Sequence, residues 1–209
     1  MLCIKKGKMF MLKFVVATGN PGKMAEFKEL TENIDIEVMT LADFDIEPPE
    51  ETGSTFVENA IIKARNAAAK SGLPAIADDS GLCVDCLDGS PGVISARYAG
   101  KGASSVECNN KLLSELRDVP ADERGASYHS VIVLIEDEND PAPLICHGVW
   151  SGYILTEPRG HNGFGYDPIF YVPTHDCSAA ELDVATKNKI SHRGLAMGEL
   201  LDILTEVIQ

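Results

Sequence analysis

The apolar run KFVVAT, residues 13–18, constrains the fold more than any other feature of the chain. Its β-branched and aromatic side chains are typical of a strand that is buried on both faces of a sheet. The polar turn GNPGK follows directly, and Asn20 and Pro21 suit the cap and the first position of a helix. A strand, a tight turn and a helix in this order predict an α/β fold.

The rest of the chain first alternates helices with strands and then becomes rich in strands. Thr55 and Glu58 fit a capping box at the start of a helix, and Gly72 is a natural end for it. Further elements are expected as a helix at 104–118, strands at 128–136, 143–157 and 169–173, and a final helix at 191–208. This order predicts a mixed sheet in one domain over residues 13–209, with residues 1–12 as an N-terminal extension or first-strand lead-in.

Charge and hydropathy argue against two classes of partner. The formal net charge of −14 does not suit a protein that binds duplex nucleic acid through Lys and Arg on phosphates. No stretch reaches the roughly 18 apolar residues of a membrane helix, so no membrane partner is expected. Lys13 interrupts the basic and apolar stretch KKGKMFMLKFVVA, which favours a cytoplasmic protein over a secreted one.

The cysteines are expected to be reduced thiols in that compartment. Cys83 and Cys86 have zinc-like spacing, but a structural zinc needs four ligands and the chain has no second Cys-x-x-Cys or His-x-His pair. We therefore interpret the two as core thiols and keep a thiol-redox or zinc function as an alternative.

The stretch ATGNPGKM resembles a phosphate-binding loop without matching the Walker pattern. That pattern needs Gly where Ala17 stands and a hydroxyl where Met24 stands. What remains is a turn with exposed N–H groups before a helix, with Lys23 beside it, and this combination suits an anion. The alternative is an ordinary strand-to-helix turn with Lys23 in solvent.

Two groups of acids surround the helix that begins near Thr55. EPPEE (47–51) precedes it, and PAIA (74–77) is predicted as a short strand that ends at Asp78 and Asp79. In the simplest interpretation these acids only complement a helix dipole and form a turn. Because ligands bind at strand ends of α/β sheets, the acids also suit a magnesium–phosphate site, in which one carboxylate binds metal while another acts on water.

The glycine-rich stretch GHNGFGYDPIF places Phe164 and Tyr166 beside Asp167. An aromatic ring there can stack on a nucleobase whose edge the carboxylate contacts, or both rings can simply fill the core. The stretch KNKISHRG brings three cationic side chains near a helix start, where cations oppose the dipole. A role in ligand binding is therefore favoured for them.

Six motifs in this order resemble the inosine/xanthosine triphosphate pyrophosphatase family over residues 14–201: TGNPGK, EETGSTFVENAIIKA, ADDSGL, GVISARYAG, GFGYDPIF and ISHRG. The resemblance implies Mg²⁺-dependent hydrolysis of the non-standard purine nucleotides ITP, dITP and XTP to the monophosphate and pyrophosphate, which cleanses the nucleotide pool. It also implies an α/β fold with an elongated central mixed sheet, flanking helices and two lobes around a deep substrate cleft, in a homodimer.

Carried over by position, the resemblance assigns a role to each motif. Asp79 would be the base that activates water, and Asp79 and Glu51 would hold Mg²⁺, with the adjacent Glu50 as a second candidate. The substrate would be held by Thr18, Gly19, Asn20, Pro21, Gly22 and Lys23 at the triphosphate, by Ser80, and by Phe164, Gly165, Tyr166, Asp167, Lys187, His192 and Arg193 at the base and sugar.

Selectivity for a 6-oxopurine follows from unpaired donors. A donor that faces the 6-oxo group, from Lys187, His192 or Arg193, would find no acceptor when adenine is bound. An unpaired donor is costly in a buried site. Two other readings stay open, namely a pyrophosphatase for modified pyrimidine or methylated nucleotides, and a non-catalytic nucleotide-sensing module that would not need Asp79.

Overall fold

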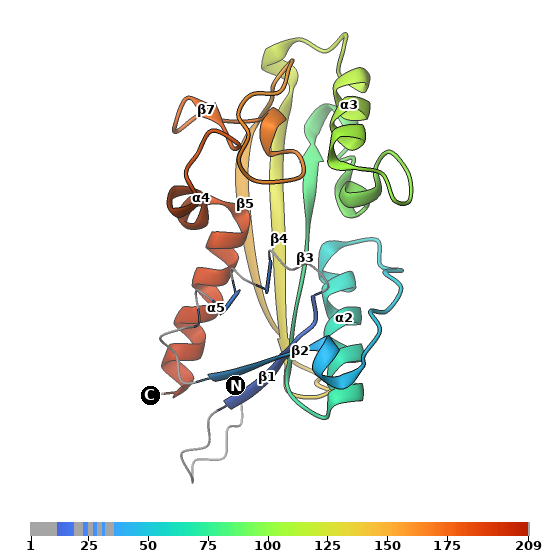
Figure 1. The fold of residues 1–209 in the computed structure, drawn as a ribbon, viewed down its shortest axis with the longest axis vertical. Coiled ribbons are helices and arrows are strands. Elements are labelled where there is room, and N and C mark those ends of the chain that lie inside the picture. Colours follow the sequence, from blue (N-terminus) through green and yellow to red (C-terminus); the bar gives the residue numbers. More distant parts are fainter. Residues whose placement is uncertain (1–11, 19–22, 25–26, 29–30, 32–35, 209) are drawn as a thin grey trace. The chain divides into compact units, whose positions relative to one another are not determined.

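The computed structural model describes residues 12–18, 23–24, 27–28, 31 and 36–208. These form an α/β fold with a seven-stranded sheet in the order β2-β1-β3-β4-β5-β6-β7 (Figure 1). The strands are β1 Leu12–Val16, β2 Ile36–Thr40, β3 Ala75–Val84, β4 Gly125–Ile135, β5 Leu144–Ile154, β6 Phe170–Val172 and β7 Cys177–Ser178. The helices are α2 Phe56–Ser71, α3 Ser105–Glu115, α4 Val184–Ile190 and α5 His192–Ile208.

The sheet is mixed, as the sequence predicts. β1 pairs in parallel with both β2 and β3, whereas β6 is antiparallel to β5 and to β7. The described residues divide into two compact units. Unit 1 comprises those up to Asp79, Val131–His147 and those from Ala196 onward, and unit 2 comprises Ser80–Ser130 and Gly148–Leu195. The single domain expected over residues 13–209 stays a prediction.

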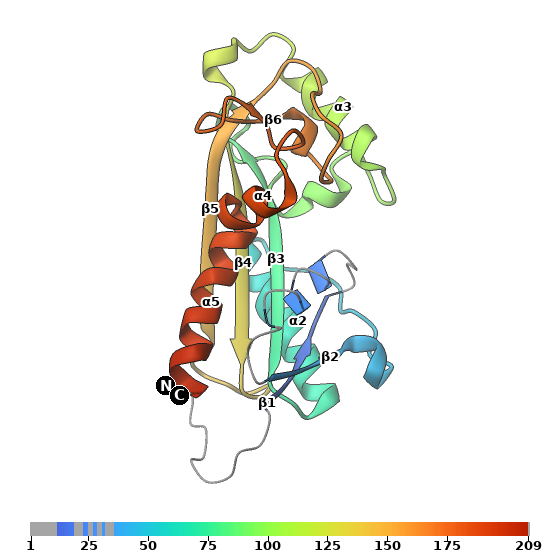
Figure 2. The same cartoon turned by 60° about the vertical axis from the view of Figure 1, so that its left-hand side comes forward.

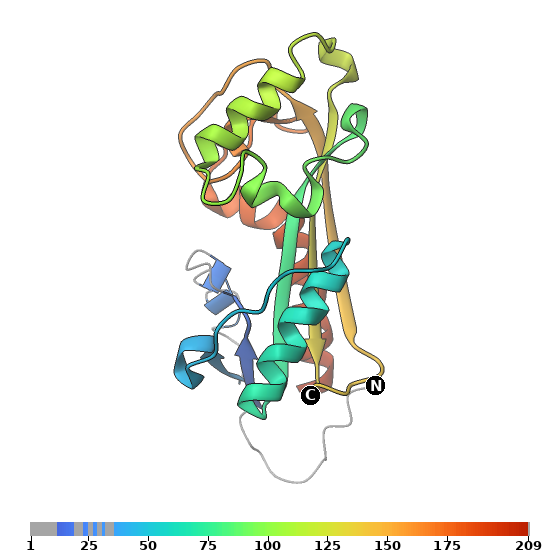
Figure 3. The ribbon, with the colours of Figure 1, turned by 90° about the vertical axis from the view of Figure 1, so that its right-hand side faces the viewer.

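Unit 1 has three layers, with α2 on one face of its strands and α5 on the other (Figure 3). Alternation along β1 explains this arrangement, since successive side chains of a strand point to opposite faces. Val15 packs with the buried alanines of α2, whereas Phe14 and Val16 pack with Leu200 and Leu204 of α5.

Helix α2 is bounded as its sequence predicts. The Thr55 hydroxyl accepts from the Glu58 N–H at 3.2 Å, and the Glu58 carboxylate accepts from the Thr55 N–H at 2.9 Å. Gly72 ends the helix with a φ of 69°. In the helix expected after β1, Lys23, Met24, Phe27, Lys28 and Thr31 are helical, while the turn from Gly19 to Gly22 lies outside the described residues.

The prediction that the strand PAIA ends at the two aspartates is wrong. β3 continues through Asp78 and Asp79 as far as Val84. Leu82 and Val84 are fully buried in the core of unit 2, so burial of these side chains outweighs the turn tendency of Asp-Asp-Ser-Gly. The two acids therefore lie within a long strand.

Unit 2 has its own core, in which Leu112 of α3 packs with Trp150 and Phe170. Figure 2 shows α3 and β6, two elements of this unit. The interpretation of Cys83 and Cys86 as core thiols is wrong, because Cys83 is only half-buried and Cys86 is exposed. The chain leaves the sheet at Val84, and Cys86 lies in the 3-10 helix Asp85–Leu87 that follows.

No helix within the described residues has the length and apolar character needed to cross a membrane.

Candidate active site

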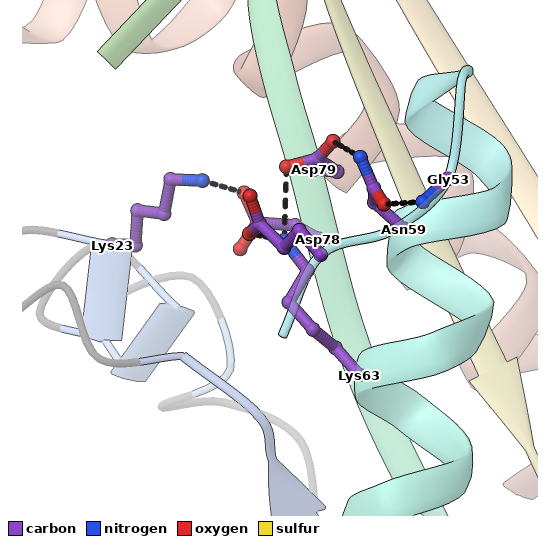
Figure 4. A network of polar contacts seen from close by, with 7 residues as sticks. Lys23, Gly53, Asn59, Lys63, Asp78 and Asp79 are labelled. Atoms are coloured by element: carbon purple, nitrogen blue, oxygen red, sulfur yellow. Dashed lines mark hydrogen bonds and ion pairs between the residues drawn. The ribbon is translucent and has the colours of Figure 1, made fainter. Parts of the chain in front are cut away.

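Asp78 and Asp79 contact different parts of unit 1 because they are consecutive residues of β3 (Figure 4). Asp78 forms an ion pair with Lys23. Asp79 is buried against α2, where Lys63 Nζ lies 2.9 Å from its Oδ1 and Asn59 Nδ2 lies 3.4 Å from its Oδ2. We call these five residues together with Glu51 the acid–lysine network.

Lys63 joins two of the predicted acids. Its Nζ is 2.9 Å from Asp79 Oδ1 and 3.2 Å from Glu51 Oε1, and its side chain is only 12% exposed. Of the adjacent Glu50 and Glu51, it is thus Glu51 that shares a cation with Asp79. Sequence reasoning missed Lys63, although its position offered a signal: it follows Ala60 by three residues and so lies on the stripe that α2 buries.

Burial and charge act in opposite directions within this network. Burial raises the pKa of Asp79, and the nearby Lys63 ammonium offsets only part of that increase. Burial alone would lower the pKa of Lys63, but Asp79, Asp78 and Glu51 outweigh it and raise the pKa. Lys63 therefore stays charged, and Asp79 is a stronger proton acceptor than an ordinary carboxylate.

Glu51 and Asp79 are suited to a hard divalent cation. Both offer carboxylate oxygens, which Mg²⁺ prefers, and both already contact one positive charge, the Lys63 ammonium. Within the described ranges, no three or more His, Cys, Asp or Glu side chains group as a metal site. If Glu51 and Asp79 hold Mg²⁺, water and phosphate oxygens would fill other positions around the ion.

The other predicted phosphate-end residues are only partly described. Thr18 follows β1 and is half-buried, and Ser80 follows Asp79 in β3 and is also half-buried. The predicted positions Gly19, Asn20, Pro21 and Gly22 lie outside the described residues.

A second group of predicted residues meets in unit 2. The buried Asp167 carboxylate accepts from the Phe164 N–H at 2.7 Å and from the Lys187 ammonium. Lys187 Nζ lies 5.0 Å and the Arg193 guanidinium 5.3 Å from the centre of the Phe164 ring. These four residues form what we call the aromatic–cation group, in which two cations lie over a ring that is 51% exposed.

Side chains of Asp167 and Asn109 lie close to the backbone of the loop that carries Phe164. A Cβ at Gly163 would lie 2.1 Å from Asp167 Oδ2, so only glycine allows this approach. Asn109 of α3, which sequence reasoning missed, donates from Nδ2 to the Gly165 carbonyl at 3.1 Å. The Asn-Asn pair at 109–110 offered no signal that separated a buried amide from an exposed one.

Tyr166 and His192 are packed inside unit 2. Tyr166 is 4% exposed, and its hydroxyl donates to the Ser95 carbonyl at 2.8 Å, while burial raises its pKa. The His192 ring is buried and stacks on Tyr128, with centroids 4.6 Å apart. Of the two aromatic side chains predicted to meet a base, Phe164 is therefore the exposed one.

Comparison with known proteins places the chain in a family. The model of the Ham1 family matches residues 14–203. The dITP/XTP pyrophosphatase of Coxiella burnetii is 57% identical over 196 residues, which cover 94% of this chain and 98% of that protein. The dITP/XTP pyrophosphatase of Vibrio parahaemolyticus is 55% identical over 190 residues, with 91% and 95% covered.

A solved structure agrees with these sequence matches. The structure of a HAM1 protein from Coxiella burnetii superimposes with a TM-score of 0.91 at 57% identity, and 94% of this chain and 100% of that one are covered. The family match and these relatives together show that the chain belongs to the Ham1 family.

Proposed function

We propose that this protein is a nucleoside triphosphate pyrophosphatase that hydrolyses the non-standard purine nucleotides ITP, dITP and XTP to the monophosphate and pyrophosphate. The observation that carries this proposal is the identity of 57% and 55% to two dITP/XTP pyrophosphatases over more than nine-tenths of the chain. The acid–lysine network supplies the groups that such a reaction needs.

Asp79 is the proposed base. A water oxygen forms a new bond to phosphorus, its proton passes to the Asp79 carboxylate, and the bond between that phosphorus and the bridging oxygen of the α–β linkage breaks. The geometry supports this role, because the carboxylate is buried and accepts from Lys63 on one oxygen and from Asn59 on the other. Lys63 donates to one oxygen of this carboxylate.

The triphosphate is proposed to meet Lys23 and the turn from Thr18 to Lys23. Lys23 belongs to the acid–lysine network through its ion pair with Asp78. Phosphate oxygens would add to the acceptors of this ammonium, which has three donors. Ser80 is proposed to lie beside the bound substrate.

Glu51 and Asp79 are proposed to hold Mg²⁺, for which their shared contact with a cation gives support. When bound, Mg²⁺ neutralises phosphate charge and the charge that develops on pyrophosphate. Lys63 supplies a fixed positive charge at the same carboxylates, so the protein itself offsets part of their repulsion.

The aromatic–cation group is proposed to bind the base. The exposed ring of Phe164 can stack on a purine, and Lys187 and Arg193, whose charged groups lie over this ring, can donate to a 6-oxo group. His192 is proposed as a further donor from its buried position against Tyr128. Against adenine these donors would be unpaired, so adenine is disfavoured.

We further propose a cytoplasmic homodimer on the strength of the family resemblance alone. Light scattering of the purified protein tests the dimer.

Pyrophosphate release tests the function. Purified protein with Mg²⁺ should release pyrophosphate from dITP, ITP and XTP much faster than from GTP, ATP or dTTP, with the monophosphate as co-product. Release of orthophosphate or preference for dTTP would contradict the proposal. Omission of Mg²⁺ in the presence of a chelator should abolish turnover. Turnover that persists would show that the reaction does not need Mg²⁺.

A further inference from the structure

Asn59 is an unusual residue for its place in α2. It is 0% exposed, and the other buried residues of this helix are Ala60, Ala64, Ala67 and Ala68. Asparagine forms helices less well than alanine, and a buried amide is costly unless its polar atoms are paired. An alanine in this position would satisfy both the helix and the core, so the amide needs another reason.

Both ends of the Asn59 side chain are in use (Figure 4). Oδ1 accepts from the Gly53 N–H at 2.8 Å, and Nδ2 donates to Asp79 Oδ2 at 3.4 Å. A Cβ at Gly53 would lie 2.7 Å from Asn59 Oδ1 and 2.6 Å from Glu58 Cβ. The loop therefore reaches Asn59 only because residue 53 is glycine, and this loop carries Glu51 two residues earlier.

Asn59 and Lys63 act on the same carboxylate from one face of α2. They are four residues apart, which places them on adjacent turns of the helix. Lys63 contacts Asp79 Oδ1 and Asn59 contacts Oδ2, so each oxygen has a different donor. Two donors on different oxygens fix the plane of a carboxylate, which one donor leaves free to rotate.

We propose that Asn59 is a positioning residue for hydrolysis: its amide holds the Asp79 carboxylate in the orientation needed to take a proton from water, and its carbonyl fastens the loop of Glu51 to the same point. This inference rests on the proposed function, in which Asp79 is the base. The competing role is a purely structural one, in which Asn59 only satisfies the Gly53 N–H.

Two substitutions separate these roles. Asn59→Asp keeps an acceptor for the Gly53 N–H but loses the donor to Asp79 and adds a charge. Asn59→Leu adds no charge but loses both bonds. The loss that the two variants share is the donor to Asp79. Asn110→Asp, at an exposed position of α3, makes the same chemical change away from this network and is the matched control.

The experiment measures kcat and KM for dITP with saturating Mg²⁺, at a temperature where circular dichroism shows each variant to be folded. Both Asn59 variants are expected to lose about 10- to 100-fold in kcat, the usual cost of removing a residue that orients a reactive group, with KM unchanged. The control should match the wild type. Thermal unfolding gives a second readout. The melting temperature of Asn59→Leu should be lower than that of the wild type, because leucine leaves the Gly53 N–H without its acceptor.

Several outcomes would overturn the inference. A folded Asn59→Leu with wild-type kcat would show that the donor to Asp79 is dispensable. A fall in kcat confined to Asn59→Asp would assign the effect to added charge. If the wild type and the control themselves release no pyrophosphate from dITP, the proposed function fails and the inference fails with it, a result distinct from both of the others.

Discussion

Lys63 in unit 1 and Lys187 in unit 2 are both largely buried lysines, 12% and 17% exposed, and each binds a buried aspartate. Their remaining neighbours differ. Lys63 meets a second carboxylate, Glu51, whereas Lys187 lies over the ring of Phe164. Lys63 thus neutralises two carboxylates in unit 1, whereas Lys187 neutralises one carboxylate in unit 2 and also lies over an aromatic ring.

This difference indicates a division of labour. The acid–lysine network has the groups proposed to accept the proton and to bind metal and phosphate, so changes there should act on kcat. The aromatic–cation group has a flat exposed ring with donors around it, so changes there should act on KM and on base selectivity. Each prediction below tests that division, from the largest effect to the smallest.

Asp79→Asn is expected to lower kcat by about 10²- to 10⁴-fold, because the amide cannot accept the proton from water. Steady-state pyrophosphate release measures this, with dITP binding measured separately by calorimetry. Asp202→Asn, an exposed change on α5, is the control and should retain activity. Near-normal turnover of Asp79→Asn would show that Asp79 is not the base. It would also contradict the expectation that changes in the acid–lysine network act on kcat.

Lys63→Met and Lys187→Met compare the two lysines directly. Each variant should lose about 3 kcal/mol of unfolding free energy, because each leaves a buried aspartate without its cation. The kinetics should differ: Lys63→Met should lower kcat, while Lys187→Met should raise KM and reduce the preference for dITP over ATP. Denaturant unfolding and steady-state kinetics measure both quantities, with the exposed Lys70→Met as control.

If Lys63→Met and Lys187→Met changed the same kinetic constant by the same factor, the two regions would not be functionally distinct.

Phe164→Ala should raise KM for dITP by roughly 5- to 150-fold, the equivalent of about 1–3 kcal/mol for a stacked base. Its kcat should change little, and its unfolding midpoint should stay near that of the wild type because the ring is half exposed. Phe164→Tyr keeps the stacking surface and should restore KM. A fall in kcat without a change in KM would place Phe164 in the chemical step.

The smallest expected effect concerns the helix caps, which are alike in the two units. Hydrogen bonds from Ser54 and Thr55 lower the pKa of Glu58 in unit 1, and those from Ser104 lower that of Glu107 in unit 2. A lowered folded-state pKa stabilises the fold above the unfolded value of 4.5, and this stability is lost as the pH falls through the folded value.

As the pH falls below 4.5, the thermal midpoint of the wild type should therefore fall more steeply than that of Glu58→Gln or of Glu107→Gln. Equal slopes for all three proteins would show that neither cap contributes. A flattened slope in one variant alone would show that only one of the two capping boxes stabilises the protein.

Some features of the site could be predicted because they depend on local chemistry. The capping box at Thr55 and Glu58 satisfies backbone donors within one turn, so four residues of sequence suffice to predict it. The reactive roles of Glu51 and Asp79, and the ligand-binding roles of Lys187 and Arg193, stay predictions.

Other features depended on packing between distant segments. The continuation of β3 past Asp79 was not predictable, because Leu82 and Val84 are buried by residues far along the chain. Lys63 was missed for a similar reason, since its partners come from a loop and from β3.

By itself the sequence determined the α/β class and the capping box at Thr55 and Glu58, because each depends on residue type and short-range spacing. The roles of the acids stay predictions. The tertiary structure decided which of Phe164 and Tyr166 is exposed and which oxygens of Asp79 meet Lys63 and Asn59. Two aromatics only two residues apart have nearly the same local signature. Their burial is set by the core against which the loop packs, and that core forms only when the whole chain has folded.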